Sequence, residues 1–351
     1  MGRYLVTGAA GFIASRVCEL LIEQGHSVVG LDNLCDAYDV RLKQYRLARL
    51  QQLPAFEFHQ VDISDREAVE AALRSQERPS TTDHKPQSSD DSPSSVVRGL
   101  PPENFSALIN LAARAGVRAS VENPWDFVDT NMTGTLNMLE LCRTYGIPKF
   151  VLASTSSIYG GGAPLPTPET ASSDLPLQPY AASKKGAEAM CHAYHYLYGI
   201  DVTVFRYFTV YGPAGRPDMV MFRFVQWIME GRPVHLNGDG TQSRGFTYLD
   251  DIAHGTLLGL KPLGYEIINL GGHEVITMNA MIARLESLLG RKATLVHHPF
   301  HKADMLANQA DISKARRLLG WEPQVGLAEG MRRLVDWYLA ERSWASQVIT
   351  A

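Results

Sequence analysis

The sequence has few cysteines and no paired cysteine motif. Four of them, Cys18, Cys35, Cys142 and Cys191, are scattered over the 351 residues without a CxxC pair or a repeated spacing. Such spacing excludes a disulfide framework and the common zinc sites, and it is typical of reduced, packed thiols in a cytoplasmic protein. We therefore expect a cytoplasmic protein without structural disulfides.

Long hydrophobic runs and an excess of positive charge are also missing. No apolar stretch approaches the roughly 18 residues of a membrane span, and the first residues lack the basic and apolar regions of a signal peptide. With 33 basic and 37 acidic residues, the formal net charge is −4. No basic field therefore points to nucleic acid or to an anionic membrane. The composition, 45% hydrophobic, predicts a globular protein with one large or two smaller cores.

Short β-branched runs alternate with longer segments of helical periodicity, which is the pattern of a parallel sheet covered by helices. The predicted strands are 3–7, 27–32, 56–62, 107–112, 150–155, 201–208 and 266–270. The predicted helices lie near 11–25, 41–53, 66–75, 124–145 and 180–198. Nearly continuous apolar strands such as ALINLAA indicate a sheet buried on both faces. The alternation predicts an α/β fold with a doubly wound parallel sheet of the Rossmann type.

The regular alternation weakens in the C-terminal half, where Gly and Pro become more frequent. We expect a nucleotide-binding domain over residues 1–210, to which 249–273 return. A smaller, interleaved α/β domain for the substrate is expected over 211–248 and 274–351. Segment 76–102 is rich in Ser, Asp and Pro and almost free of aromatic residues, so it cannot offset its ordering entropy by burial. It predicts a disordered surface insertion rather than a binding loop.

The turn after the first predicted strand has the spacing of a dinucleotide-binding site, TGAAGFIA from Thr7 to Ala14. Glycines allow the backbone to approach a pyrophosphate, and the following helix N-terminus supplies N–H donors. Asp32, at the end of the second strand, is placed to accept hydrogen bonds from ribose hydroxyls and would repel a 2′-phosphate, which favours NAD over NADP. Asp62 could face the adenine or cap the next helix, a role open to Ser64 and Asp65 as well. The expected cofactor contacts are Gly8, Gly11, Phe12, Ile13, Asp32, Asn33, Asp62, Ile63 and Ala112, together with Tyr180 and Lys184.

A second motif, Tyr180-Ala-Ala-Ser-Lys184, places a phenol and an ammonium four residues apart, hence on one helical face. A nearby cation favours the phenolate, so Tyr180 could exchange a proton with a substrate hydroxyl. Four hydroxyl residues, Ser154 to Ser157, end the preceding strand. The glycine turn, a strand-end Ser or Thr and YxxxK together resemble the extended short-chain dehydrogenase/reductase superfamily. The resemblance implies that the lysine also binds the nicotinamide ribose and that a strand-end hydroxyl holds the reacting oxygen.

Three longer stretches are similar to UDP-glucuronate 4-epimerases: LDNLCDAYDV from Leu31, AARAGVR from Ala112 and FTVYGPAGRPDM from Phe208. This resemblance implies a catalytic trio, Thr155, Tyr180 and Lys184. The implied substrate contacts are Ser156 and Ser157 beside the sugar, Thr209 in the sugar pocket, Arg216 on the sugar carboxylate and Arg244 on the diphosphate. Arg118 is a further carboxylate candidate, and a surface charge at a helix start is an equal interpretation. Gly245 departs from the family pattern, which usually has Asp there.

The resemblance implies NAD-dependent epimerisation at C4 of a nucleotide sugar, UDP-glucuronate to UDP-galacturonate, through a transient 4-keto intermediate. It also implies a homodimer through the helices 124–145 and 180–198. A UDP-glucose/galactose 4-epimerase and a UDP-glucuronate decarboxylase remain alternatives, because all three begin with the same oxidation. An NAD-sensing protein would not need the catalytic trio.

Two other activities are disfavoured by particular residues. A 4,6-dehydratase needs an Asp-Glu pair where Ser156 and Ser157 stand, and neither serine is a strong acid or base. The histidines, His297, His298 and His301 in one group and His192 and His195 in another, lack the partners of a known metal site. We expect no metal.

Overall fold

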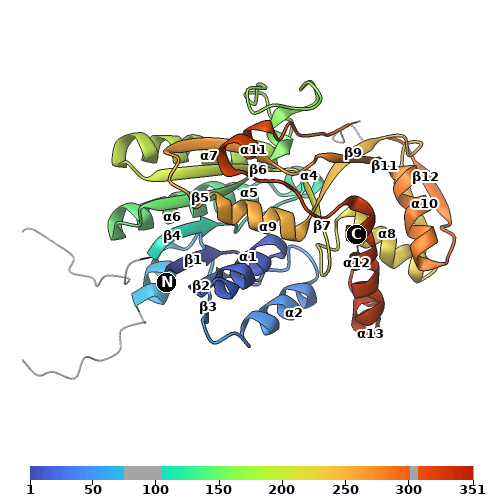
Figure 1. The fold of residues 1–351 in the computed structure, drawn as a ribbon, viewed down its shortest axis with the longest axis horizontal. Coiled ribbons are helices and arrows are strands. Elements are labelled where there is room, and N and C mark those ends of the chain that lie inside the picture. Colours follow the sequence, from blue (N-terminus) through green and yellow to red (C-terminus); the bar gives the residue numbers. More distant parts are fainter. Residues whose placement is uncertain (75–104, 301–306, 351) are drawn as a thin grey trace, which may run out of the picture.

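The computed structural model describes residues 1–74, 105–300 and 307–350, so the predicted insertion 76–102 lies outside the described residues. Its main element is a seven-stranded parallel sheet in the order β10-β6-β5-β4-β1-β2-β3 (Figure 1). The strands are β1 (Arg3–Thr7), β2 (Ser27–Asp32), β3 (Phe56–Gln60), β4 (Phe105–Asn110), β5 (Lys149–Thr155), β6 (Asp201–Tyr207) and β10 (Tyr265–Leu270). Because the strand order runs outward from β1 in both directions, the sheet is doubly wound. The predicted α/β Rossmann-like fold is confirmed.

The strands β1 and β2 have the predicted bounds, whereas β3 and β4 end two residues early. Beyond the end of β4, a side chain of the neighbouring strand β1 serves as acceptor in place of a backbone carbonyl: the Ala112 N–H donates to Thr7 Oγ1 at 3.0 Å. Thr7 Oγ1 in turn donates to Asn110 Oδ1 at 2.6 Å. Side-chain hydrogen bonds therefore replace the backbone ladder at these strand ends. The pattern of hydrophobic residues alone does not reveal where the strands end.

Helices cover both faces of the sheet, and two hydrophobic clusters fill the space beneath them. One face carries α1 (Phe12–Glu23), α9 (Leu249–Leu258) and α11 (Ser313–Leu319). The other carries α3 (Arg66–Arg74), α6 (Gly134–Tyr145) and α7 (Pro179–Tyr198). Neighbouring strand residues enter opposite clusters, as Leu5 and Val6 do, because side chains alternate along a strand. Helix α2 (Val40–Leu50) follows β2.

The predicted helix 124–145 is divided in the structure. It consists of α5 (Trp125–Val128), a π-helical turn (Asp129–Thr133) and α6, and a short helix α4 (Val117–Glu122) precedes it. The π-helical turn contains the buried Asn131, which bonds the backbone of Arg114 in both directions at 3.0 Å and Ser183 Oγ at 2.9 Å. This turn thereby joins the loop after β4 to helix α7, and such turns often mark functional sites.

The remaining elements form a smaller body at one end of the sheet, seen with α8, α10 and α12 in Figure 1. A three-stranded sheet has the order β11-β9-β7, and β12 pairs with β8. The strands are β7 (Thr209–Tyr211), β8 (Val234–Asn237), β9 (Ser243–Tyr248), β11 (Glu274–Thr277) and β12 (Leu295–His298). The helices are α8 (Val220–Met229), α10 (Met278–Leu289), α12 (Leu327–Ala340) and α13 (Arg342–Ala345).

A third hydrophobic cluster lies within this body, between α8, α10, α12 and the β9 strand. The segment Ala310–Trp321 does not belong to it: Ala310, Leu319 and Trp321 pack into the first cluster, beneath the large sheet. The assignment of 274–351 to the smaller domain stays a prediction. The packing of 310–321 beneath the large sheet favours assigning that segment to the nucleotide-binding domain. Among residues 1–74, 105–300 and 307–350, no helix is both long and apolar enough to cross a membrane.

Candidate active site

The turn between β1 and α1 requires glycine at two positions. Gly8 has a φ of +68°, and a Cβ there would lie 2.8 Å from the Ala112 backbone. A Cβ on Gly11 would lie 2.7 Å from the Gly8 carbonyl oxygen. Helix α1 begins at Phe12, and no side chain in the described part of the chain caps its first turn. The turn therefore leaves N–H groups and space for a pyrophosphate, as predicted for a dinucleotide site.

Asp32 ends β2 and is buried at the same edge of the sheet. Its carboxylate accepts hydrogen bonds from the Ala10 N–H at 3.1 Å and the Leu34 N–H at 2.8 Å. The ammonium of Lys43, on α2, lies 3.6 Å from Asp32 Oδ1 and donates to Cys35 Sγ at 3.3 Å. Two carboxylate oxygens offer about four acceptor positions, so Asp32 retains capacity for ribose hydroxyls. The placement fits the expected role.

Asn33, Asp62 and Ile63 lie together at the neighbouring strand ends. Asn33 Nδ2 donates to Asp62 Oδ2 at 2.6 Å, and Ser64 donates to Asp62 Oδ1 through its N–H and hydroxyl. These bonds outweigh burial, so the pKa of Asp62 is lowered. Helix α3 is capped by Asp65, whose Oδ1 accepts from the Ala68 N–H at 3.0 Å. Because Asp65 caps the helix, Asp62 does not serve as its cap. Asp62 instead lies at the edge of the sheet where a nucleotide base would bind.

The three residues of the expected catalytic trio meet where β5 ends. Thr155 is the last residue of β5, and its Oγ1 accepts from the Ser157 N–H at 3.2 Å, which starts a 3₁₀ turn (Ser156–Tyr159). Tyr180 lies in the first turn of α7, near enough to Thr155 for that side chain to lower the pKa of the phenol. The ring of Phe127, on α5, packs edge-on against Tyr180 at 6.0 Å between centroids. The phenol is therefore held by one polar and one aromatic neighbour.

The YxxxK spacing predicts that the Lys184 ammonium favours the Tyr180 phenolate, and the electrostatics of the trio differ from this prediction. The Lys184 ammonium donates to the Ala153 carbonyl at 2.8 Å. Burial lowers the pKa of Lys184 to about 8, while Cys191 and Glu188 raise it. Burial raises the pKa of Tyr180, whereas the hydrogen bond to Thr155 and the charge of Arg216 lower it. The cation that favours the phenolate is thus Arg216, which comes from a different part of the chain.

Arg216 lies in the loop between β7 and α8. It makes two hydrogen bonds to Asp218, at 3.1 and 2.5 Å, and donates to the Ala115 carbonyl at 3.1 Å. The Tyr38 ring lies 5.9 Å from its guanidinium carbon. Nearby Asp218 keeps the guanidinium protonated and, in turn, has a lowered pKa. The structure therefore places the charge of Arg216, the expected carboxylate ligand, where it acts on the pKa of Tyr180, the expected proton-transfer group.

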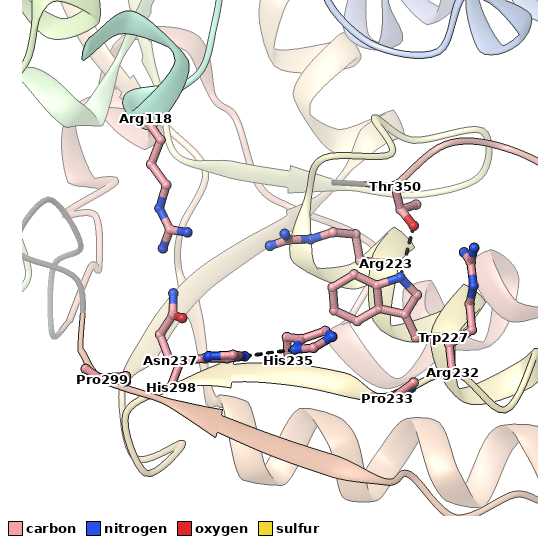
Figure 2. Close-up of a pocket in the computed structure, with 10 residues that line it drawn as sticks. All are labelled: Arg118, Arg223, Trp227, Arg232, Pro233, His235, Asn237, His298, Pro299 and Thr350. Carbon is pink, nitrogen blue, oxygen red and sulfur yellow. Dashed lines mark hydrogen bonds between the residues drawn. The ribbon is translucent and has the colours of Figure 1, made fainter. Parts of the chain in front are cut away.

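A cavity of about 680 Å³ lies between α4 and the smaller body (Figure 2). Figure 2 shows Arg118 reaching from α4 toward Asn237 and His298, with Arg223 pointing into the same space. Arg118 was a predicted site residue, but the others were not. His235 and His298, on paired strands, are joined by a hydrogen bond of 2.8 Å between ring nitrogens. The lining is Arg118, Arg223, Trp227, Arg232, Pro233, His235, Asn237, His298, Pro299 and Thr350.

This cavity is strongly cationic, because three of its lining residues are arginines. The Arg223 guanidinium lies 5.4 Å from the Trp227 ring, and Trp227 Nε1 donates to Thr350 Oγ1 at 2.9 Å. Arginine forks suit phosphate oxygens, and an aromatic wall suits a planar base. The cavity has the chemistry of a nucleoside diphosphate site.

Arg244, the predicted diphosphate ligand, is the second residue of β9, outside the lining of this cavity, and donates to the Ser243 carbonyl at 2.8 Å. Its neighbour Gly245 explains the departure from the family pattern. A Cβ there would lie 2.2 Å from the Gly272 carbonyl oxygen, so the approach of two backbones requires glycine. Thr209 is the first residue of β7, opposite Phe246 of β9.

Two predicted serines follow Thr155, and one has an unforeseen partner. Ser157 is half-buried, while the buried Ser156 accepts from Asn308 Nδ2 at 3.3 Å. In the described chain, the buried Oδ1 of Asn308 has no hydrogen-bond partner. A buried acceptor without a partner is rare. It makes Asn308 a site residue that the sequence did not single out, since 152 positions separate it from Ser156.

The fold and the grouping of Thr155, Tyr180 and Lys184 beside a glycine turn define the class: a Rossmann-type enzyme of the short-chain dehydrogenase/reductase kind. The model of the NAD dependent epimerase/dehydratase family matches residues 4–90 and 91–271, and the chain belongs to this family. The family resemblance and the enzyme class expected from sequence are confirmed.

Three individual proteins are similar to this chain over nearly its whole length. The chain is 53% identical over 338 residues to a UDP-glucuronate 4-epimerase of Thermodesulfobacterium geofontis, with 96% of each chain covered. A crystal structure of UDP-glucuronic acid 4-epimerase from Bacillus cereus, with UDP-glucuronic acid and NAD, matches with a TM-score of 0.81 and 32% identity; it covers 97% of this chain and 99% of that one. A UDP-glucose 4-epimerase of Thermotoga maritima with UDP-glucose matches with a TM-score of 0.82, 32% identity and the same coverage.

Proposed function

We propose that this chain catalyses the NAD-dependent epimerisation of UDP-glucuronate at C4, giving UDP-galacturonate. The observation that carries the proposal is the position of Arg216, whose charge acts on the Tyr180 phenol. A guanidinium at the reacting group supplies the partner that a sugar carboxylate needs. The 53% identity to a UDP-glucuronate 4-epimerase supports the same substrate.

The residues present fit NAD. The glycine turn at Gly8 and Gly11 accepts a pyrophosphate, Asp32 accepts ribose hydroxyls, and Asn33 and Asp62 border the base. When bound, NAD supplies the capacity to take a hydride from C4 of the sugar and to return it to the opposite face.

Tyr180 and Thr155 perform the proton chemistry in this proposal. Thr155 holds the sugar O4 by its hydroxyl, and Tyr180 removes and later returns the O4 proton. Arg216 and Thr155 counteract the effect of burial on the Tyr180 pKa, which brings the phenol nearer to a useful base. Lys184, bonded to the Ala153 carbonyl, keeps further donors that would serve the nicotinamide ribose.

Arg216 also separates epimerisation from decarboxylation. Its guanidinium already makes a two-point contact with a carboxylate, Asp218. A substrate carboxylate can share this guanidinium through the same fork geometry. A carboxylate held by a fixed cation keeps its charge and does not leave as CO₂, so we favour retention of all six sugar carbons.

The direct test is to incubate the purified protein with UDP-glucuronate and to follow the sugar by NMR. UDP-galacturonate without net NADH formation is the expected product. A UDP-pentose would establish the decarboxylase alternative, and turnover of UDP-glucose without UDP-glucuronate would establish the UDP-glucose/galactose alternative. Arg216→Gln should lower kcat/KM for UDP-glucuronate by roughly 10- to 100-fold. The loss for UDP-glucose should be smaller, because that substrate loses only the effect of the charge on the Tyr180 pKa.

We further propose that the protein is a cytoplasmic homodimer paired through α5, α6 and α7. Large apolar side chains are exposed on these helices, notably Trp125 at 73%, Tyr196 at 81% and Leu197 at 63%. An interface that covered these side chains would remove their apolar surface from water. Sedimentation of the unsubstituted chain should give twice its 38.8 kDa mass, and Trp125→Lys together with Leu197→Lys should give the monomer.

A further inference from the structure

Three consecutive residues at the end of β5 each hold one residue of the same face of α7. The Ala153 carbonyl accepts from Lys184 Nζ at 2.8 Å, and Ser154 Oγ donates to Glu188 Oε1 at 2.5 Å. The pairs are Ala153 with Lys184, Ser154 with Glu188 and Thr155 with Tyr180. The three helical residues follow one another at intervals of four, so they form a row along one face. Tyr180 and Lys184 belong to the proposed trio, whereas Glu188 has no assigned role.

Glu188 is held on its other side by Arg206 of β6. The two side chains are each 2% exposed, and Arg206 bonds both carboxylate oxygens, at 3.1 and 2.8 Å. Arg206 also donates to the Tyr159 hydroxyl at 3.0 Å, which donates to Asn269 Oδ1 of β10 at 2.6 Å. Glu188 is therefore fixed to three neighbouring strands, β5, β6 and β10, through one connected network.

A buried ion pair is an expensive way to pack a helix on a sheet, because well-packed apolar residues are often as stable or more so. A carboxylate at this position does two things that an apolar side chain could not do. Its hydrogen bond from Ser154 fixes the position of α7 along its axis relative to the end of β5. Its negative charge also favours the ammonium of Lys184, one turn away, against the effect of burial on the Lys184 pKa.

We propose that Glu188 is a positioning residue for the reaction: with Ser154 and Arg206 it fixes α7 against the end of β5 and so sets where the Lys184 ammonium and the Tyr180 hydroxyl lie. This proposal rests on the catalytic roles assigned to Tyr180 and Lys184 above. Glu188 itself does not touch the reacting atoms.

Two substitutions test the proposal, one with a larger expected effect, Glu188→Gln, and one with a smaller expected effect, Ser154→Ala. Glu188→Gln removes the charge and weakens both contacts, while Ser154→Ala removes one hydrogen bond and leaves the ion pair with Arg206. Displacements of about 1 Å in a catalytic group can cost about 100-fold in rate. We expect kcat to fall roughly 10- to 100-fold in Glu188→Gln and a few-fold in Ser154→Ala, with KM changed less than about threefold. Glu188→Asp, which keeps the charge, should recover part of the loss.

Lys149→Met supplies the matched control. Lys149 lies at the opposite end of β5, is also buried, and pairs with Asp201 of β6 while donating to Thr203 Oγ1 at 2.8 Å. Its loss should lower the melting temperature and leave kcat unchanged. If Glu188→Gln lowers kcat no more than Lys149→Met does at the same fraction folded, the proposal is wrong. Should Glu188→Gln not fold, an unchanged kcat in both Ser154→Ala and Glu188→Asp overturns it equally.

Crystal structures of the unsubstituted protein and Ser154→Ala test the same point without a substrate. The proposal requires the distance from Lys184 Nζ to the Ala153 oxygen, 2.8 Å here, to lengthen in the variant. An unchanged distance would contradict the positioning role. Failure of the unsubstituted protein to turn over UDP-glucuronate, with this distance changed in the variant, would instead refute the proposed function alone.

Discussion

The end of β5 and the arginine-lined cavity are built in opposite ways. At the end of β5 the polar groups lie close together: Thr155 and Lys184 are buried, Tyr180 is half-buried, and Lys184 is bonded to the Ala153 carbonyl. The cavity is wide, and Arg118 and Arg223 point into it from separate elements (Figure 2). Proton transfer requires reacting atoms held within fractions of an ångström, whereas a charged ligand is attracted over longer distances. In the proposed mechanism, the end of β5 therefore positions the reacting groups, and the cavity attracts the charged ligand.

Their origins in the sequence differ as well. The strand end and the helix that faces it come from two neighbouring segments, 153–157 and 180–188. The cavity combines α4, the segment 223–237, the end of β12 and Thr350. If the separation holds, substitutions at the first region should change kcat, and those at the second should change KM.

The largest expected effect belongs to Tyr180→Phe, which removes the proton-transfer group and keeps the ring packed on Phe127. General acid–base catalysis contributes about 10²- to 10⁴-fold, so we expect kcat to fall about 1,000-fold with little change in substrate affinity. Steady-state kinetics and calorimetric binding of UDP-glucuronate measure the two effects. Tyr198→Phe, on the same helix and half-exposed, is the control. A kcat within tenfold of the unsubstituted value would contradict the proton-transfer role of Tyr180. Absence of turnover in the unsubstituted chain, with a ligand response that Tyr180→Phe retains, would favour the NAD-sensing alternative.

Thr155→Val should have the next largest effect, about 100-fold on kcat, because it removes a hydroxyl and keeps the shape. The substitution also removes the hydrogen bond that lowers the Tyr180 pKa. Thr155→Ser keeps the hydroxyl and should retain activity within about tenfold. A larger loss in the serine variant than in the valine variant would show that the methyl group, and hence packing, is what matters at this position.

Arg118→Gln and Arg223→Gln test the cavity. Each removes a charge from the lining, and a hydrogen bond to a charged group contributes about 1.5–3 kcal/mol. We therefore expect KM for the UDP-sugar to rise about 10-fold or more in each variant while kcat changes less than threefold. Arg333→Gln, on exposed α12 and paired with Glu329 outside the cavity, should leave both constants unchanged. A loss confined to kcat would contradict the separation of the two regions.

The smallest expected effect is on pH dependence. Because burial lowers the pKa of Lys184 to about 8, its ammonium should be lost as the pH rises through that value. Activity should therefore decline several-fold between about pH 8 and 9.5, as measured by kcat over that range. The unfolded chain holds this proton to about pH 10.4, so stability should rise with pH between those values at this site. Activity constant up to pH 10 would show that the ammonium is not needed.

The sequence predicted the central sheet well because its signals are local. Apolar runs of strand length, the glycine turn and YxxxK each span only a few residues, and β1 and β2 begin and end where predicted. The helix 124–145 was less well predicted, because its π-helical turn depends on Asn131 reaching Arg114 and Ser183. Where a distant partner decides the backbone, the local pattern is insufficient.

The sequence by itself therefore determined the class of fold, the turn suited to a dinucleotide and the identity of Thr155, Tyr180 and Lys184. The tertiary structure alone decided what surrounds them. It placed Arg216 where its charge acts on Tyr180, joined Glu188 to Arg206, and brought Asn308 to Ser156. It also showed why Gly245 cannot carry a side chain beside Gly272. The physical reason is that hydrophobic period and turn chemistry act between neighbours in sequence, whereas charge, burial and close backbone approach act between neighbours in space.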